Sequence, residues 1–383
     1  MNHTSPKQIG DYNKNQVLTI LREKGPASRI ELSRLLEISA TAVTRNTSKL
    51  LTKGIIRECG AEHSILGRKP VLMELCGDFC YVIGVDIVGG TLKVALADLM
   101  GTIIKYNEEP VKFKQGAQAV AEQLIAASRS IIQEAEVPPG KVWVITVGTP
   151  GIFNSETGKS RFTFFLDGWD EIDIRSKVSN ELAIETLIEN DVNLDLVGES
   201  WKGVGRNYEN ILYVKLGQGL AARIVLNNKL LRGNNRMAGE IGYMLPGLSF
   251  ESTDNYENLL CNDSVSRKYR EFGGSEKING LSGLLALKGR GDYIAEKVIN
   301  YVLDLFAVVL LNSNTVLDPQ VIILGGDASS FDESQIALLK EKIEKYLPLV
   351  QNIIPSKLDK KACLYGAIKT GLDRVEERIT DIW

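Results

Sequence analysis

The sequence predicts a small helical domain with a β-hairpin, followed by a larger α/β body built from two similar halves. Three observations support this prediction. The first 75 residues hold twelve Lys and Arg against seven Asp and Glu, although the whole chain has a net charge of −3. Within them, three short helical patterns precede a hairpin pattern. The remainder twice repeats a buried strand, a glycine turn and a hairpin.

Composition excludes several classes of protein. The 383 residues, 44% hydrophobic and 24% charged, are typical of a globular chain with two or three domains. The two histidines, His3 and His63, lie near the N-terminus, so the rest of the chain cannot carry a Ser/His/Asp triad or a histidine-ligated metal. No signal peptide, CxxC pair or membrane-length apolar stretch occurs. We therefore expect a cytoplasmic protein with no membrane partner.

The basic segment begins with three predicted helices. The first covers residues 13–24 and ends at Gly25-Pro26. The second follows a capping box formed by Ser28 and Glu31, and the third runs from Ala40 to Gly54. Two short helices joined by a tight connection are typical of a helix-turn-helix, whose second helix enters the major groove of DNA.

The third helix and the hairpin after it supply the predicted DNA contacts. The predicted contact residues on that helix are small hydroxyl and basic side chains: Thr41, Thr44, Arg45, Ser48 and Lys49. The hairpin forms a wing, and its tip presents Gly67, Arg68 and Lys69 to a phosphate or the minor groove. The alternative is a small helical cap with a solvated charged face. Charge, helix spacing and wing together favour DNA binding, so we predict a winged helix-turn-helix over residues 1–78.

Each half of the body opens on a strand that ends in a glycine turn. The first strand covers residues 81–86 and ends at Asp86, shortly before Gly89-Gly90. The second half repeats this arrangement over residues 210–233, and a later strand, 318–327, also ends in a glycine pair. Because glycine turns expose backbone N–H groups, they suit an anion such as phosphate. The repeat predicts a duplicated fold with a cleft between its lobes.

The motifs of the body, taken in order, resemble those of the ROK family (repressor, open reading frame, kinase). They are Asp86 with Gly89-Gly90, Gly148-Thr149-Pro150-Gly151, Glu189-Asn190-Asp191, Gly217-Gln218-Gly219, Ala238-Gly239-Glu240-Ile241-Gly242 and Leu324-Gly325-Gly326. The resemblance covers essentially the whole chain, and with its winged helix the chain is similar to the sugar-responsive repressors of the family, xylose repressors among them. It implies an actin-like, ribonuclease-H-like ATPase-fold body. Lobe I would then cover residues 79–188 and lobe II residues 189–365, with a C-terminal helix, 366–383, packing back on lobe I.

The resemblance also implies which residues bind sugar. In ROK sugar kinases the Asp of the Glu-Asn-Asp motif is the general base and the Asn binds another hydroxyl, which places these roles on Asp191 and Asn190. Glu240 and the backbone of Gly151 would also contact the sugar. Tyr243 occupies the position of a family histidine and is retained through its hydroxyl or its ring. The alternative for Asp191 is that it merely caps a helix.

Other family features are missing. The zinc-binding cysteine cluster is reduced to Cys261, so we expect no structural zinc, and a further sugar-contacting Glu of the family falls on Leu260. The first phosphate loop has Val88 at a family glycine position. The second carries side chains at two more, with Arg223 expected to fill the nucleotide space. We therefore expect no cofactor and no ATP with Mg²⁺.

Three functions remain open at this stage. The first is a sugar-responsive transcriptional repressor of carbohydrate metabolism, not an enzyme, which binds operator DNA and a sugar effector as a homodimer or higher homo-oligomer. The second is an ATP-dependent sugar or N-acetylhexosamine kinase that uses Asp191 as its general base. The third is a constitutive DNA-binding regulator whose cleft is inactive, suggested by Tyr243 and Leu260.

Overall fold

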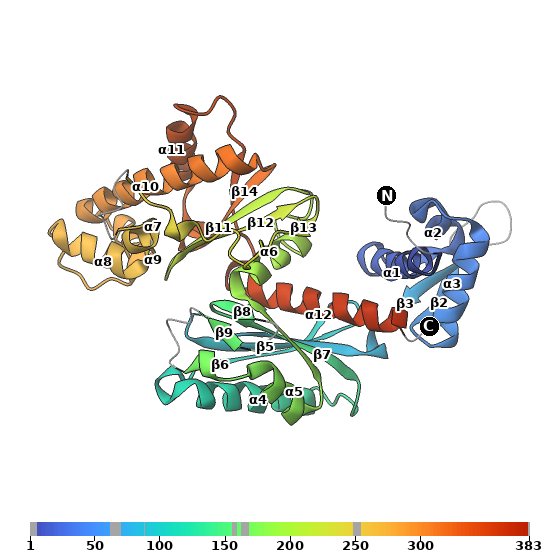
Figure 1. Cartoon of the computed structure of the whole chain (residues 1–383). Helices are drawn as coiled ribbons and strands as arrows, with labels where there is room; N and C mark the ends of the chain where they lie inside the picture. The colour runs from blue at the N-terminus through green and yellow to red at the C-terminus, as the bar shows by residue number, and fades with distance from the viewer. Residues whose placement is uncertain are drawn as a thin grey trace. The chain divides into compact units, whose positions relative to one another are not determined.

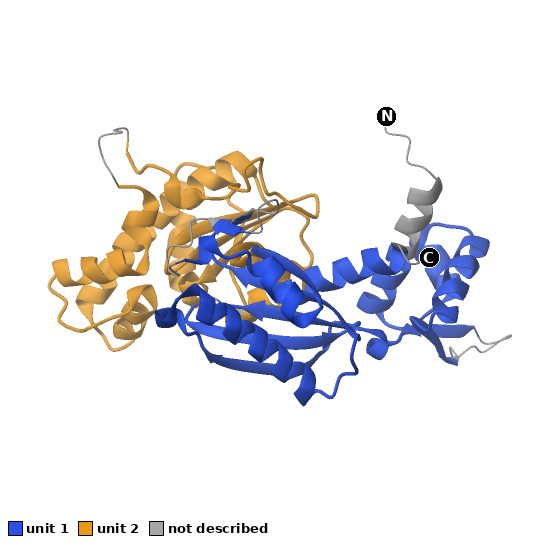
Figure 2. Ribbon diagram, turned by 60° about the horizontal axis from the view of Figure 1, so that its bottom comes forward, with its two compact units in different colours: residues 1–189, 367–383 blue, residues 190–366 orange. Residues whose placement is uncertain are grey.

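The computed structural model describes residues 6–61, 70–87, 89–154, 159–161, 168–247 and 254–381 (Figure 1). The chain divides into two compact units (Figure 2). Unit 1 comprises residues 1–189 and 367–383, and unit 2 comprises residues 190–366. The backbone therefore passes from one unit to the other twice, after Glu189 and after Gly366.

The N-terminal part of unit 1 has the helices and wing that the sequence predicts. Its elements are α1 (Pro6–Lys24), β1 (Ala27–Ser28), α2 (Arg29–Leu36), α3 (Ala40–Thr52), β2 (Ile56–Ala61) and β3 (Val71–Leu75). The capping box at α2 is present, because Ser28 and Glu31 each accept a backbone N–H of the other. The three strands pair in the order β1-β3-β2. Helix α1 begins seven residues earlier than predicted, because the prediction rested on the apolar residues from Val17 onward, and the sequence before them is mostly polar.

The rest of unit 1 is a five-stranded sheet covered by helices on both faces. The strand order is β10-β7-β4-β5-β6. Ile83 and Val85 pack with residues of α4 and α5 on one face, whereas Gly371 of α12 approaches Val82 and Thr146 on the other. The strands are β4 (Tyr81–Asp86), β5 (Thr91–Asp98), β6 (Ile103–Pro110), β7 (Val142–Thr149) and β10 (Glu185–Asn190), with the short pair β8 (Ile152–Asn154) and β9 (Lys159–Arg161). The helices are α4 (Gly116–Glu134), α5 (Ile174–Leu182) and α12 (Ala362–Asp381).

Unit 2 repeats this sheet. Its strand order is β13-β12-β11-β14-β15. In both units three consecutive strands form an antiparallel meander, and two later strands extend the sheet beside the first strand of that meander. This correspondence confirms the predicted duplication. The strands are β11 (Ile211–Leu216), β12 (Leu220–Leu226), β13 (Lys229–Leu230), β14 (Val321–Gly326) and β15 (Asn352–Pro355). The helices are α6 (Asp191–Trp201), α7 (Tyr256–Leu260), α8 (Asn262–Glu271), α9 (Gly280–Lys288), α10 (Tyr293–Leu317) and α11 (Glu333–Glu344).

Alternation along the strands of unit 2 separates two faces. Leu212 and Val214 of β11 join the large apolar cluster that includes α10, whereas Ile211 and Tyr213 pack with residues of α6. Lys215 of β11 follows the same alternation onto the α6 face, and Arg223 pairs in register with Tyr213. Two cationic side chains therefore face the helix that begins at Asp191.

Within unit 2, helix α6 and the first turn of α12 touch through their backbones. A Cβ built on Gly366 would overlap the carbonyl oxygen of Leu194, and one built on Gly198 would overlap the carbonyl oxygen of Ala362. Only glycine permits this separation. The two glycines therefore fix α12 on α6.

Within unit 1, the later turns of α12 hold helix α1. The Arg22 guanidinium forms an ion pair with Glu376 and donates from Nε to the carbonyl oxygen of Leu99 at 2.9 Å. The Arg22 and Glu376 side chains are 3% and 9% exposed. Burial raises the pKa of Glu376, and the charge of Arg22 opposes that shift. Helix α1 is thus joined to α12 by a desolvated ion pair, which is costly to break from one side.

No helix among the residues that the structure describes is both long and apolar enough to span a membrane.

We expect Gly366→Ala to lower the free energy of unfolding by about 1–3 kcal/mol, because the added methyl group overlaps the Leu194 carbonyl oxygen. Gly371→Ala is the control on the same helix. Its Cβ would meet Thr146 and Val82 at 3.3 Å, and the gain in helix propensity of about 1 kcal/mol offsets that tighter contact. Urea denaturation of both variants measures the difference. Equal midpoints would contradict the close contact between α6 and α12.

Candidate functional site

The face of α3 predicted to contact DNA is exposed. Thr41, Thr44, Arg45, Ser48 and Lys49 are all exposed, whereas Val43, Asn46, Thr47 and Leu50 are buried. Ser39 caps the helix by accepting the N–H of Ala42 at 3.2 Å. The recognition face is therefore a stripe of short hydroxyl and basic side chains on a capped helix.

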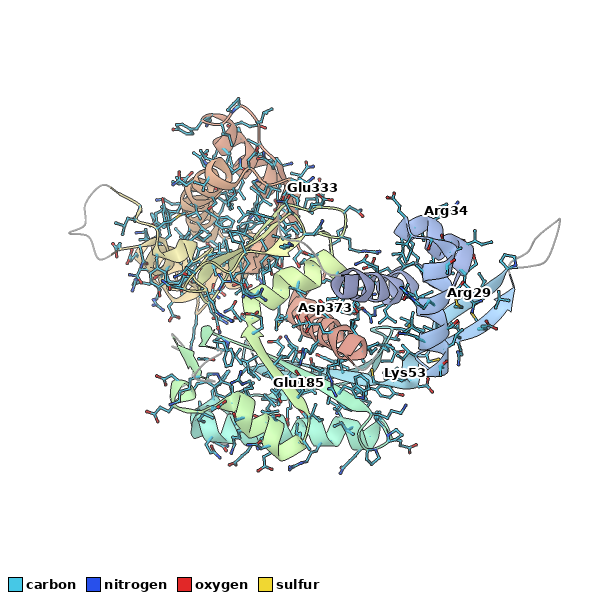
Figure 3. The ribbon with its side chains drawn as sticks, turned by 45° about the vertical axis from the view of Figure 1, so that its right-hand side comes forward. Arg29, Arg34, Lys53, Glu185, Glu333 and Asp373 are labelled. Carbon is cyan, nitrogen blue, oxygen red and sulfur yellow. The ribbon has the colours of Figure 1, made fainter. Side chains whose placement is uncertain are left out.

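Other basic residues of this domain are exposed or form contacts to α3. Arg34 and Lys53 are exposed, and the sequence analysis did not select them (Figure 3). Arg29 is half-buried and donates to Thr47 of α3 and Glu58 of β2, both at 3.3 Å, so it links three elements.

The wing has the predicted antiparallel pairing, but its tip is not described. β2 and β3 pair from Ile56 opposite Leu75, and Arg57 forms an ion pair with Glu74 at 2.7 Å across them. The predicted tip residues Gly67, Arg68 and Lys69 lie outside the described residues. Their role in DNA binding stays a prediction.

Asn190 is the N-cap of α6. Its Oδ1 accepts the backbone N–H groups of Val192 at 3.0 Å and Asn193 at 3.1 Å. Asp191 is instead the first helical residue. The alternative that Asp191 merely caps this helix is therefore wrong, because its neighbour performs that role.

The Asp191 carboxylate is engaged by Lys215 of β11. Lys215 Nζ lies 2.9 Å from Asp191 Oδ2 and 2.7 Å from Asp195 Oδ2, one helical turn further along α6. Burial lowers the pKa of Lys215, but the two carboxylates outweigh it and hold the pKa well above its usual range. One ammonium thus joins the predicted sugar-binding carboxylate to a second one.

Arg223 of β12 joins two more of the predicted sugar-binding side chains, Asn190 and Glu240. It is 4% exposed and donates to Glu240 Oε1 at 2.8 Å, to Asn190 Oδ1 at 3.1 Å and to the carbonyl oxygen of Ala222 at 2.6 Å. We expected Arg223 to fill the nucleotide space. Strand alternation directs the guanidinium toward Asn190 and Glu240. That Arg223 also fills the nucleotide space stays a prediction.

Gly239 allows the backbone before Glu240 to lie close to β12. Gly239 has φ +87° and accepts the N–H of Ala222 at 2.7 Å, and a Cβ there would overlap the Ala222 carbonyl oxygen. Tyr243, in the short helix η4 (Ile241–Tyr243), is 52% exposed. Partial burial raises the pKa of Tyr243, and the charges of Glu240 and Glu257 raise it further. Among the hydrogen bonds of the described residues, none joins Tyr243 to Asn190 or Asp191.

Glu257 is the carboxylate that the sequence analysis missed. Leu260, the residue assigned to the family Glu position, is 1% exposed and lies in the apolar cluster with α10. Glu257, one helical turn earlier, accepts the N–H of Leu220 at 2.6 Å at the end of the Gly217–Gly219 turn. Burial raises the pKa of Glu257, the Leu220 N–H lowers it in part, and Glu240 raises it further. A resident carboxylate thus occupies a backbone donor of this glycine turn.

The remaining predicted features lie in unit 1. Gly151 follows β7 with φ +81° and belongs to a different unit from Asn190, Asp191, Glu240 and Tyr243. Asp86, at the end of β4, forms a buried ion pair with Lys93 at 2.8 Å. No group of three or more His, Cys, Asp or Glu residues in the described part of the chain is arranged to hold a metal ion.

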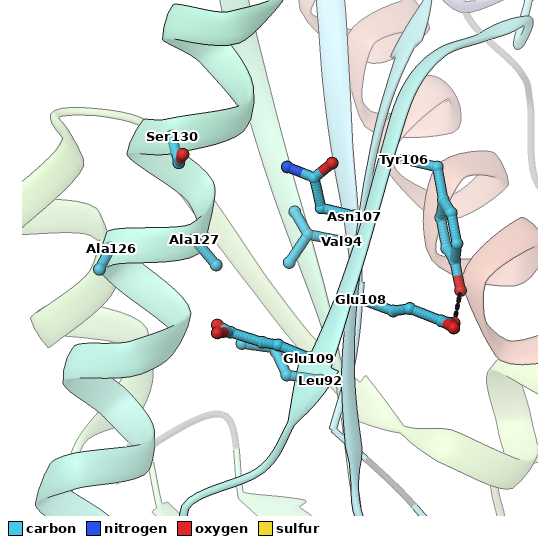
Figure 4. Close-up of a pocket in the computed structure, with 9 residues that line it drawn as sticks. All are labelled: Leu92, Val94, Tyr106, Asn107, Glu108, Glu109, Ala126, Ala127 and Ser130. Carbon is cyan, nitrogen blue, oxygen red and sulfur yellow. Dashed lines mark hydrogen bonds between the residues drawn. The ribbon is translucent and has the colours of Figure 1, made fainter.

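Unit 1 also contains a cavity of about 650 Å³ between β5, β6 and α4 (Figure 4). Its walls include Val94, Glu109 and Ala127, and Tyr106 donates a hydrogen bond to Glu108 at its edge. None of the predicted site residues lines it.

Comparison with known proteins agrees with both parts of the chain. Residues 11–57 match the winged helix-turn-helix DNA-binding family, and residues 82–372 match the ROK family. A xylose repressor of Caldicellulosiruptor bescii is 26% identical over 96% of this chain and 96% of its own length. A glucokinase of Halalkalibacterium halodurans is also 26% identical, but over 70% of this chain and 87% of its own.

A solved structure extends the likeness to the fold. A ROK family transcriptional regulator, described as a homolog of the E. coli MLC protein, superimposes with a TM-score of 0.80 at 20% identity, covering 97% of this chain and 98% of its own. It shares both the winged helix and the two-sheet body. Because the family match spans most of the body and the fold agrees, the chain belongs to the ROK family.

Proposed function

We propose that this protein is a sugar-responsive transcriptional repressor, whose winged helix-turn-helix binds operator DNA and whose unit 2 binds a sugar or sugar derivative. The observation that carries the proposal is the gathering of Asn190, Asp191 and Glu240 around Lys215 and Arg223 in a chain that also has an exposed recognition helix. Similarity to other proteins supports the proposal. The xylose repressor matches 96% of this chain, whereas the glucokinase matches only 70% of it.

The cluster suits a polyhydroxyl ligand. A sugar presents adjacent hydroxyls that both donate and accept hydrogen bonds, so it needs carboxylate or amide oxygens beside N–H donors. Asp191, Glu240 and Glu257 supply acceptors, and Lys215 and Arg223 supply donors. Tyr243 and the backbone of Gly151 are further sugar contacts in this proposal.

Several features argue against the kinase alternative. A general base must be free to accept a proton from the attacking hydroxyl, but Asp191 is already engaged by the Lys215 ammonium. Glu257 takes the N–H of Leu220, and the Asp327 carboxylate lies near Gly217, so the second glycine turn is flanked by negative charge. An ATP phosphate would meet two carboxylates there. We therefore propose a binding protein that needs neither ATP with Mg²⁺ nor a structural zinc.

A repressor of this class acts on DNA in the cytoplasm. Two recognition helices, one from each copy in a homodimer or higher homo-oligomer, would fit two half-sites of an operator. Sugar and operator would then favour different conformations of the protein and weaken each other's binding.

The sugar site is tested with a panel of pentoses, hexoses and their N-acetyl derivatives. A sugar at about 100 times its Kd should stabilise the wild-type protein by about 2.7 kcal/mol, measured as a thermal shift. Asp191→Asn should abolish the shift. Asp195→Asn is the matched control, because it removes the other carboxylate partner of Lys215 and should leave the shift in place. No shift with any sugar would favour the constitutive regulator. ADP formation from ATP, Mg²⁺ and sugar that Asp191→Asn abolishes would establish the kinase alternative instead.

Arg223→Met should lower the free energy of unfolding by about 2–3 kcal/mol, because Glu240 and Asn190 lose the guanidinium that they share. Arg223→Lys keeps the charge without the fork of donors and should have an intermediate effect. Arg374→Met, which removes a partly exposed pair with Glu185, is the control and should cost less than about 1 kcal/mol. Chemical denaturation measures all three. A cost for Arg223→Met no larger than the control would remove Arg223 from the cluster.

Arg45→Ala should weaken operator binding by about tenfold and change the preference among operator sequences, because Arg45 lies on the exposed face of the recognition helix. Arg270→Ala removes the same charge from α8 of unit 2 and is the control. Fluorescence anisotropy with specific and scrambled DNA at fixed salt measures both effects. Equal affinities for all three proteins would exclude α3 as the recognition helix.

A further inference from the structure

Helix α6 connects the candidate sugar cluster to the start of α12. Its first residues are Asn190, the cap, and Asp191. One to two turns later, Leu194 and Gly198 meet the backbone of α12 at Gly366 and Ala362. Any shift of Asn190 and Asp191 along α6 must therefore move the first turn of α12 or break this contact, since close-packed backbones leave no space for slippage.

A buried carboxylate on α6 also fixes the segment that leads into α12. Glu199 is fully buried, accepts a hydrogen bond from the Ser356 hydroxyl, and lies 3.4 Å from the backbone nitrogen of Leu358 as its acceptor. Its other carboxylate oxygen accepts the N–H of Val204 at 2.9 Å. Helix α6 therefore contacts both the segment that precedes α12 and the first turn of α12 itself.

Helix α12 is continuous across the boundary between the two units. It starts at Ala362 in unit 2 and ends at Asp381 in unit 1, and the boundary falls after Gly366. Glu376 lies about three turns after Gly366 on the same helix. The helix therefore continues without interruption through the turns that separate these two residues.

In unit 1, that helix reaches the first helix of the DNA-binding domain. Arg22 of α1 pairs with Glu376, and Thr19 of α1 also donates to Glu376, at 3.4 Å. Helix α1 also buries Val17, Leu18 and Leu21, and it contacts both α2 and β3. Helix α1 therefore moves with the winged helix-turn-helix rather than independently of it.

We propose that α12 couples sugar binding to DNA binding, and that the Arg22–Glu376 ion pair is the contact through which it positions the winged helix-turn-helix. This inference rests on the function proposed above. Arg22 and Glu376 are positioning residues, since each acts on DNA through the orientation of α1. The ion pair suits this role because Arg22 is held in direction by both Glu376 and the Leu99 carbonyl oxygen.

The test measures the factor by which saturating sugar changes operator affinity in the full-length protein, using the sugar that shifts the wild-type melting temperature. We expect a factor of about 5–150 for the wild type. Glu376→Gln should reduce the factor to below about 3, with operator affinity without sugar and the sugar-induced thermal shift retained. Asp373→Asn, which removes the exposed Lys369–Asp373 pair of α12, is the matched control and should keep the wild-type factor (Figure 3).

A second variant guards against misfolding, because Glu376→Gln leaves a buried Arg22 charge without its carboxylate. The double variant Arg22→Met with Glu376→Leu removes both charges, and its apolar contact gives α1 no fixed direction, so it should also fall below about 3. If saturating sugar changed the operator affinity of either folded variant as much as it changes that of the wild type, the inference would be overturned and the proposed function would remain. Sugar binding without any effect on operator affinity in the wild type would overturn both.

Discussion

Two cations on the α6 face of unit 2 make its acidic cluster possible. Asp191, Asp195 and Glu240 are drawn together in a region of low exposure, where like charges repel strongly. Lys215 neutralises the first two, and Arg223 binds the third together with Asn190. The position of the Glu-Asn-Asp motif relative to the Gly-Glu-Ile-Gly motif therefore depends on side chains that belong to neither motif.

The same cations explain how a kinase-like body can serve for binding. The residues proposed to hold sugar hydroxyls remain, but the carboxylate that would act as base is paired, and a glutamate occupies a donor of the second glycine turn. Binding requires only that hydroxyls exchange hydrogen bonds with the cluster, whereas phosphoryl transfer also requires a free base and an unobstructed phosphate site. The pairing of Asp191 and the position of Glu257 therefore act against phosphoryl transfer but leave hydrogen bonding to a ligand possible.

The sequence was sufficient for features that depend on local pattern. Capping at Ser28, the exposed stripe of α3, the wing and the duplicated sheets follow from spacing, periodicity and turn residues. Lys215 and Glu257 were missed, and Arg223 was assigned to the nucleotide space without its contacts to Asn190 and Glu240, because the partners of all three residues are distant in sequence. A Lys and an Arg inside otherwise apolar strands were the available signal, since a buried strand accepts a charge only beside a partner. Leu260, which stands at the position of a family Glu, is buried in the apolar cluster with α10.

Helix α12 contributes contacts to both units, because it starts in unit 2 and continues in unit 1. A linker of flexible residues would let each unit adopt its own orientation, whereas a continuous helix transmits rotation and displacement along its length. Its glycines at 366 and 371 sacrifice helix propensity for close contact, first with α6 and then with the sheet of unit 1. Its last turns then hold α1 through an ion pair rather than through apolar packing alone. Within unit 2 the glycine of α12 thus allows close contact with α6, and within unit 1 the charge of Glu376 holds α1.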